Sequence, residues 1–420
     1  MNKTLLNKVE ILSKILLVFS CFFCIVFNTT FFSAKVVSCF VLFLSIRMLV
    51  HSRHNDYLVI VYGFITYANY SICAAYYLFP VNNFFTTFKK DEKSVLAISV
   101  LYVFMAIINI ADVKNSKNED KSDFENICIR DKSKEVTWIG CILLIIGVFV
   151  KSGAIFEYSL IIFIICYYYS ENRLQEIFLA LLAFCYIYKN LSGESRVVSL
   201  QLIIVMYLFN KRLRKHRMFM LLFVVVLVVL FSFIGYSRVN NDFFGLSLNS
   251  ALDIFRKEYL ANDTSYSSYF TSITFLKTRD FTSLNDRLIL LCKFVLSIFV
   301  GGTLAGTDSS LPAYTHRFFL HYYGGVLPIY IYFYLGWTGV CCIAVYVVYL
   351  LKKIGGKITG GVQKCMCVYV VATVPRWYLY SPLQLFRGVM LTFVVFKLSQ
   401  LFLNQLKGRS KDFLYHNIRS

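Results

Sequence analysis

The side chains best suited to chemistry in this sequence are arginines at the ends of apolar segments. Arg196 opens one segment in LSGESRVVSL, Arg238 follows another, and Arg376 and Arg387 flank the short connection in VPRWYLYSPLQLFRGVM. A guanidinium carries a permanent charge and offers two parallel N–H groups, which suits it to the oxygens of a diphosphate. We therefore predict a site for a phosphorylated substrate. The alternative is anchoring to lipid headgroups or pairing with a neighbour such as Glu194.

Arginines that are held in place would also assist a reaction. A diphosphate leaving group gathers negative charge as its bond to a sugar breaks, so fixed guanidinium groups would stabilise the transition state without a metal. His316 and His321, in THRFFLHYYGG, are candidate bases because imidazole exchanges protons near neutral pH. They are five positions apart, a spacing that would not place both on one helical face, so we expect at most one to be essential. Glu258, Asp286 and Asp308 are other candidate bases. Either histidine could instead be a polar loop residue without a role in chemistry.

The composition shows what must position these groups. Of 420 residues, 58% are hydrophobic and 16% are charged, whereas soluble proteins are about half apolar and about a quarter charged. Apolar runs recur from residue 11 to residue 404, which predicts one all-α polytopic membrane protein. The net charge of +20 comes from basic residues in short loops between these runs, so membrane topology accounts for it and no nucleic-acid partner is expected. The C-x-C of Cys365 and Cys367 has no second Cys or His pair nearby, and we predict neither a metal nor a cofactor.

The apolar runs predict about twelve transmembrane helices. They fall near 11–28, 31–50, 57–79, 94–113, 136–151, 153–169, 174–189, 197–209, 217–236, 326–350, 364–375 and 384–404. With a cytoplasmic N-terminus, the basic stretches 47–53, 114–134, 211–217, 352–364 and the tail from Lys407 all lie inside. This agreement requires that the apolar segment 288–304 does not cross. Lys293 lies near its centre, so we expect an amphipathic or re-entrant helix there.

Three regions follow from this topology. Residues 1–236 carry nine transmembrane helices, residues 237–325 form one large periplasmic loop, and residues 326–420 carry three more helices and a cytoplasmic tail. The loop mixes aromatic, hydroxyl, amide and charged residues, which is typical of carbohydrate sites but also of an exposed lid without a site. We expect Arg238, Arg287, Tyr322 and Tyr380 to contact the substrate.

Several of these stretches resemble one known family. The R-x-V opening of a long span at Arg196, the Gly-rich GGTLAGT, the HRFFLHYYGG followed by YLGWTGV, and the closing VPRWYLYSPLQLFRG are similar to the O-antigen polymerase and ligase superfamily. So is YGFITYANYS with the following YLFP. The resemblance covers most of the chain as topology and short motifs, and it points to the Wzy-type repeat-unit polymerases.

The resemblance implies a GT-C-like helical bundle in the bacterial inner membrane with a periplasmic active face. Its substrates would be polyprenyl-diphosphate-linked oligosaccharides, as donor and acceptor. The resemblance is also compatible with a chain-length regulator protein as a partner. The functional arginines of the family map onto Arg196, Arg376, Arg387 and Arg238, and its loop histidine onto His316 or His321. The rivals are a ligase, which differs in its acceptor, and a flippase for the same lipid-linked unit. A flippase should show two similar halves, and the sequence shows no clear halves.

Overall fold

The structure, a computed structural model, describes residues 3–30, 32–78, 92–111, 132–149, 153–192, 196–210, 264–321, 324–356 and 358–417. All regular secondary structure in these ranges is helical. Seven of the described helices are long and apolar enough to cross a membrane: Lys8–Phe27, Ala34–His51, Asp56–Tyr77, Lys93–Ile110, Arg173–Leu191, Leu327–Gly355 and Gln384–Leu406. The protein is therefore a multi-pass helical membrane protein. The total of twelve spans stays a prediction, and the expected span 217–236 lies outside the described residues.

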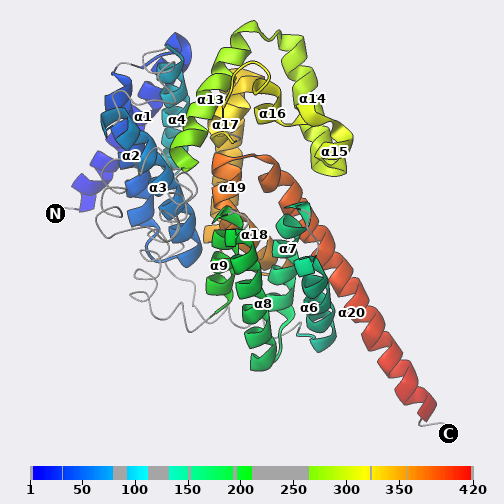
Figure 1. The fold of residues 1–420 in the computed structure, drawn as a ribbon. Helices are drawn as coiled ribbons and strands as arrows, with labels where there is room; N and C mark the ends of the chain where they lie inside the picture. Colours follow the sequence, from blue (N-terminus) through cyan, green and yellow to red (C-terminus); the bar gives the residue numbers. More distant parts are fainter. Residues whose placement is uncertain are drawn as a thin grey trace, which may run out of the picture. The chain divides into compact units, whose positions relative to one another are not determined.

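The chain packs into two units, each made of separate stretches (Figure 1). Unit 1 contains Met1–Ser116, Val229–Gly356 and Val374–Leu383. Its described helices are α1 (Lys3–Phe27), α2 (Ala34–His51), α3 (Asp56–Leu78), α4 (Glu92–Ile110), α13 (Thr264–Phe281), α14 (Leu284–Val300), α15 (Gly302–Ala305), α16 (Leu311–Thr315), α17 (Leu327–Gly355) and α19 (Val374–Leu379), with a 3-10 turn, η3, at Thr307–Ser309. This division follows packing, and it leaves the predicted periplasmic loop untested.

Helix α4 forms the centre of unit 1. It packs against α1, α2, α13 and α17, and its buried side chains occur on every face of the helix. By contrast, α1 exposes most of its apolar surface, as a helix in contact with lipid should. A buried polar link joins three other helices of the unit. The Asn69 amide donates to Ser45 Oγ at 2.8 Å and accepts from the Tyr378 hydroxyl at 3.0 Å, which fixes α19 against α3.

Helix α13 lies in the region for which the sequence predicts a polar loop. Its hydroxyl side chains are buried against α3, α4 and α17, and Thr271, Ser272 and Thr278 bond to backbone carbonyls one turn earlier in their own helix. This bonding satisfies hydroxyls that would otherwise be costly to bury. Helix α14 covers most of the segment 288–304. It buries Leu290 and Phe294 and exposes an apolar strip on its other side, while its side of the membrane stays a prediction.

Unit 2 contains Lys117–Val228, Lys357–Thr373 and Gln384–Ser420. Its described helices are α6 (Lys134–Phe149), α7 (Gly153–Tyr169), α8 (Arg173–Ser192), α9 (Arg196–Phe209), α18 (Gly361–Ala372), a π-helical turn η4 (Gln384–Gly388) and α20 (Val389–Asn417). The rings of Tyr167 and Phe209 stack at 5.6 Å, so α7 and α9 end together and run parallel. Lys364, near the start of α18, lies 5.5 Å from the same Phe209 ring, so α18 runs the opposite way. The predicted spans 153–169, 197–209 and 364–375 are the sixth, eighth and eleventh in the series. Alternating crossings would likewise make the first two parallel and the third antiparallel to them.

A close approach in unit 2 gives a test of this packing. A Cβ on Gly388 would collide with the hydroxyl of Tyr369, which donates to Gln384 Oε1 at 2.8 Å. We predict that Gly388→Ala lowers the free energy of unfolding by about 1–3 kcal/mol, because the ring must move and the hydrogen bond is strained. The midpoint of thermal unfolding in detergent measures this. Gly360→Ala adds the same methyl group where no atom lies within 4 Å. Equal midpoints for the two variants would contradict the packing.

Candidate functional site

The segment between α14 and α17 in unit 1 is held by glycine turns and ion pairs. Gly301 and Gly306 adopt φ angles of 89° and 87°, in the region that glycine favours, and thereby separate α14, α15 and η3. Asp308 pairs with Arg317 and also lies 3.4 Å from Lys293 Nζ. The ion pairs link η3, the turn after α16 and α14, so the segment has a defined path despite its short helices.

Both candidate histidines lie in this segment, and they lie side by side. Their ring centroids are 5.2 Å apart and nearly perpendicular. His321 Nε2 is 2.8 Å from Thr315 Oγ1, and its ring lies edge-on to Phe275 at 6.3 Å. The chain turns back after α16 instead of continuing as a helix, so the five-residue spacing brings the imidazoles together. Whether one or both act in a reaction stays a prediction.

Thr315 determines which nitrogen of His321 carries the proton in the neutral ring. Its hydroxyl lies 3.0 Å from the Leu311 carbonyl, which can only accept a hydrogen bond. With its proton directed there, Thr315 Oγ1 accepts Nε2–H from His321. Nδ1 is then the basic nitrogen of the neutral ring, the tautomer that a general base needs.

Gly324 and Gly325, shortly after His321 in sequence, pack against α19, which carries Arg376. Gly325 N–H donates to the Leu379 carbonyl at 2.8 Å, and a Cβ on Gly325 would collide with the ring of Phe275. Gly324, with φ of 137°, lies so close that a Cβ there would be 3.0 Å from the same Leu379 oxygen. The Arg376 guanidinium lies 5.7 Å from the centre of the Tyr380 ring. Unit 1 therefore brings a half-buried arginine and its tyrosine to the loop that carries the histidines.

Other predicted residues lie elsewhere or are not described. Arg387 belongs to unit 2, where its guanidinium lies 5.3 Å from the centre of the Tyr158 ring near the start of α7. Arg196 is the first residue of α9, and its side chain is outside the described part of the structure, as are Arg238 and Tyr322. Since α7 and α9 run parallel, Arg387 and the backbone of Arg196 lie at the same end of unit 2. A site shared with Arg376 stays a prediction, because Arg376 belongs to unit 1.

Arg287, a predicted substrate contact, lies on α14 beside a residue that sequence reasoning missed. Burial and the nearby charge of Arg279 lower the pKa of Arg287. Arg279 lies in the last turn of α13, 4.8 Å from the centre of the Tyr332 ring. The signal available in the sequence was an arginine in LKTRDF, but the surrounding polar residues gave no reason to single it out.

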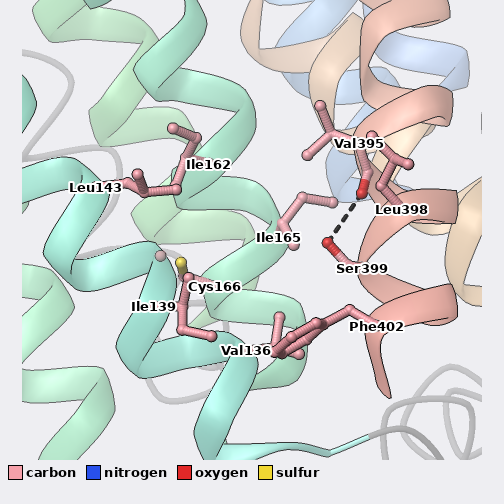
Figure 2. Close-up of a pocket in the computed structure, with 11 residues that line it drawn as sticks. Val136, Ile139, Leu143, Ile162, Ile165, Cys166, Val395, Leu398, Ser399 and Phe402 are labelled. Atoms are coloured by element: carbon pink, nitrogen blue, oxygen red, sulfur yellow. Dashed lines mark hydrogen bonds between the residues drawn. The ribbon is translucent and has the colours of Figure 1, made fainter. Parts of the chain in front are cut away.

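Unit 2 also contains an apolar cavity of about 240 Å³ between α6, α7 and α20 (Figure 2). It is lined by Val136, Ile139, Gly140, Leu143, Ile162, Ile165, Cys166, Val395, Leu398, Ser399 and Phe402. The hydroxyl of Ser399 donates to the Val395 carbonyl at 2.9 Å, so it is already used within α20. A lining of this kind suits hydrocarbon.

Comparisons with models of known protein families, with curated proteins and with solved structures give no match for this chain. The class that the observations define is a multi-pass helical membrane protein. Its unit 1 carries clustered imidazole, guanidinium and aromatic groups beside the start of a long apolar helix.

The Thr315 contact can be tested directly. We predict that Thr315→Val lowers the free energy of unfolding by about 1 kcal/mol and exposes His321 Nε2, because the hydroxyl that holds the ring is removed. The rate of His321 modification by diethyl pyrocarbonate, followed by mass spectrometry, should rise. Thr338→Val is the matched control, since Thr338 is exposed and bonds only to the Leu335 carbonyl in its own helix. An unchanged rate in Thr315→Val would show that Thr315 does not hold the imidazole.

Proposed function

We propose that this protein is a glycosyltransferase that joins undecaprenyl-diphosphate-linked oligosaccharide repeat units into a surface polysaccharide at the periplasmic face of the bacterial inner membrane. The observation that supports this best is that the Thr315–His321 pair and the Arg376–Tyr380 pair both lie in unit 1, where Gly325 donates to the Leu379 carbonyl of the helix that carries Arg376. These residues lie in turns and short helices of unit 1, outside the long apolar helices. The resemblance of the sequence to Wzy-type polymerases points to the same reaction.

The chemistry of such a transfer needs a base and a stabiliser of the leaving group. An acceptor sugar hydroxyl attacks C1 of the donor sugar, and its proton passes to Nδ1 of His321. The new C1–O bond replaces the bond from C1 to the diphosphate oxygen, which leaves with the electron pair. Arg376 binds this oxygen as negative charge develops on it, which lowers the energy of the transition state more than that of bound substrate. The reaction needs no metal in this scheme.

Aromatic side chains give the proposed site its affinity for sugars. The face of a sugar ring carries C–H groups that pack on aromatic rings, while hydroxyls at the edge need polar partners. Tyr380 lies beside Arg376 and presents both an aromatic face and a hydroxyl. One side chain can thereby orient the sugar next to the cation that binds its diphosphate.

Substitution of Arg376 tests the proposal. We predict that Arg376→Ala lowers the rate of chain extension by about a hundredfold or more, the usual cost of losing a group that stabilises developing charge. Gel electrophoresis of the surface polysaccharide should show long chains collapsing to a single repeat, with the protein level unchanged. Arg173→Ala removes an exposed arginine at the start of α8 and should retain long chains. Retained long chains in the Arg196, Arg376 and Arg387 alanine variants would exclude the diphosphate role, and loss of the single repeat on deletion would favour a flippase.

Substitution of His321 and substitution of His316 should have different effects on chain extension. We predict that His321→Gln abolishes chain extension, because glutamine keeps hydrogen bonding but cannot accept the proton. We also predict that His316→Gln retains it, since His321 is the imidazole with the Thr315 contact. The same gel assay measures both variants. Full activity of His321→Gln would rule out His321 as the base and leave Asp308 or His316 as the group to examine.

A further inference from the structure

Helix α17 is broken within its first turns, and an arginine occupies the break. Gly336 has φ of 63° and ψ of −145°, so the helical hydrogen bonds are interrupted there. Arg279 Nε donates to the Phe333 carbonyl at 3.3 Å, and a Cβ on Gly336 would lie 3.2 Å from Arg279 Nη2. The absence of a side chain at Gly336 thus makes room for the guanidinium, which in turn satisfies a carbonyl that the break leaves open.

A second arginine lies close to the first without a carboxylate partner. Arg287 Nη1 is buried and forms no hydrogen bond with the described residues. Neither Arg279 nor Arg287 forms an ion pair within the described part of the chain. The two nearby carboxylates are already engaged, because Asp280 binds Lys93 Nζ at 2.7 Å and Asp286 accepts from the Ser283 hydroxyl at 2.7 Å. Arg279 in the last turn of α13 and Arg287 in the first turn of α14 flank the short connection between these helices, near enough for their charges to interact. Their like charges repel, and a bound anion would remove that cost.

Aromatic and amide groups surround this arginine pair, Arg279 and Arg287. The Tyr332 hydroxyl lies within electrostatic range of both arginines, and its ring lies 4.8 Å from the Arg279 guanidinium. Asn28 Oδ1 accepts from the Tyr332 hydroxyl and from Trp337 Nε1, each at 3.1 Å. These bonds tie the end of α1 to the break in α17. The pair therefore lies beside the C-terminal end of α1.

The surface around the arginine pair is apolar and open. Phe27 at the end of α1 is 61% exposed, Leu284 and Leu288 on α14 are 59% and 41% exposed, and Leu335 beside the break is 41% exposed. A soluble anion would gain nothing from these side chains. A molecule with a phosphate group attached to hydrocarbon would use both the charges and the apolar surface.

We propose that Arg279 and Arg287 form a binding site for the phosphate group of a membrane lipid, with the lipid chains lying on the exposed side chains of α1, α14 and α17. The guanidinium groups would bind the phosphate oxygens, and Trp337 would lie at the edge of the headgroup. This inference does not rest on the proposed transferase activity, because binding is measured without any transfer. The lipid is either a bulk anionic phospholipid or a polyprenyl phosphate, and the experiment separates the two.

Binding can be followed by tryptophan fluorescence of the whole protein in an uncharged detergent. Phosphatidylglycerol, undecaprenyl phosphate and inorganic phosphate are each titrated while the emission is recorded. We expect a saturable change with at least one of the two lipids, and the tighter of them identifies the source. We expect no saturation with inorganic phosphate over the same range. Trp337→Phe should remove the signal, although Trp138 and Trp377 remain.

The variants make the test specific to the arginine pair. Arg279→Gln/Arg287→Gln should weaken lipid binding about tenfold or more, since each charged hydrogen bond contributes about 1.5–3 kcal/mol. Arg287→Gln alone leaves the Arg279 bond to Phe333 intact, so it reports on binding if the double variant unfolds. Lys352→Gln/Lys353→Gln removes two cations from the far end of α17 and should bind as the unchanged protein does.

Three outcomes would overturn the proposal. Lipid binding in Arg287→Gln that equals binding in the unchanged protein would exclude a role for the pair. An equal loss in Lys352→Gln/Lys353→Gln would show that binding follows net charge alone. A fluorescence change that persists in Trp337→Phe would place the lipid elsewhere on the protein.

Discussion

Every backbone N–H and C=O group within the hydrocarbon of a membrane needs a partner from the protein, because lipid supplies none. The described chain meets this condition with helices and places its polar chemistry at their ends. The break at Gly336 is informative because it occurs inside an apolar helix, and Arg279 donates to the exposed carbonyl of Phe333. The hydrogen bond from the Arg279 guanidinium offsets the cost of the interrupted helix. The same constraint explains why the Ser and Thr side chains of α13 bond back to their own helix.

The positions of most described helices could be predicted from the sequence, because long apolar runs have few alternatives in a membrane. The run at 57–79 is α3 (Asp56–Leu78), and the run at 326–350 is α17, which continues through Lys352 and Lys353 to Gly355. Helix α13 was not anticipated, because hydroxyl residues make up much of its buried surface and the few buried apolar residues, such as Ile273 and Phe275, do not form a long apolar run. The sequence does not reveal that such residues are buried. Their burial depends on contacts with α3, α4 and α17 that are distant in sequence.

In the candidate site, too, the residue types could be predicted from the sequence but their arrangement in space could not. Residue chemistry singled out Arg376 and the two histidines, and the structure brings these groups to one region of unit 1. The adjacency of His316 and His321 could not be predicted, because it depends on a turn after α16 where helical spacing does not apply. The position of Arg387 could not be predicted either. It follows Arg376 by only eleven residues, yet the chain passes between them from unit 1 into unit 2.

Three of the arginines contact a tyrosine ring, and this kind of contact affects which ligands a guanidinium can bind. Arg279, Arg376 and Arg387 each lie against a tyrosine ring, at 4.8, 5.7 and 5.3 Å from its centre. A ring contact stabilises a guanidinium through its flat face by about 0.5–2 kcal/mol, whereas the N–H groups that bind phosphate point from its edge. A carboxylate partner would instead occupy that edge. A ring contact therefore orients an arginine without a carboxylate. In Arg279 one of the donors is used within the protein, because Nε–H donates to the Phe333 carbonyl. A tyrosine ring against a guanidinium is therefore compatible with phosphate binding. A lysine in place of the arginine would supply the positive charge but not the two parallel N–H donors.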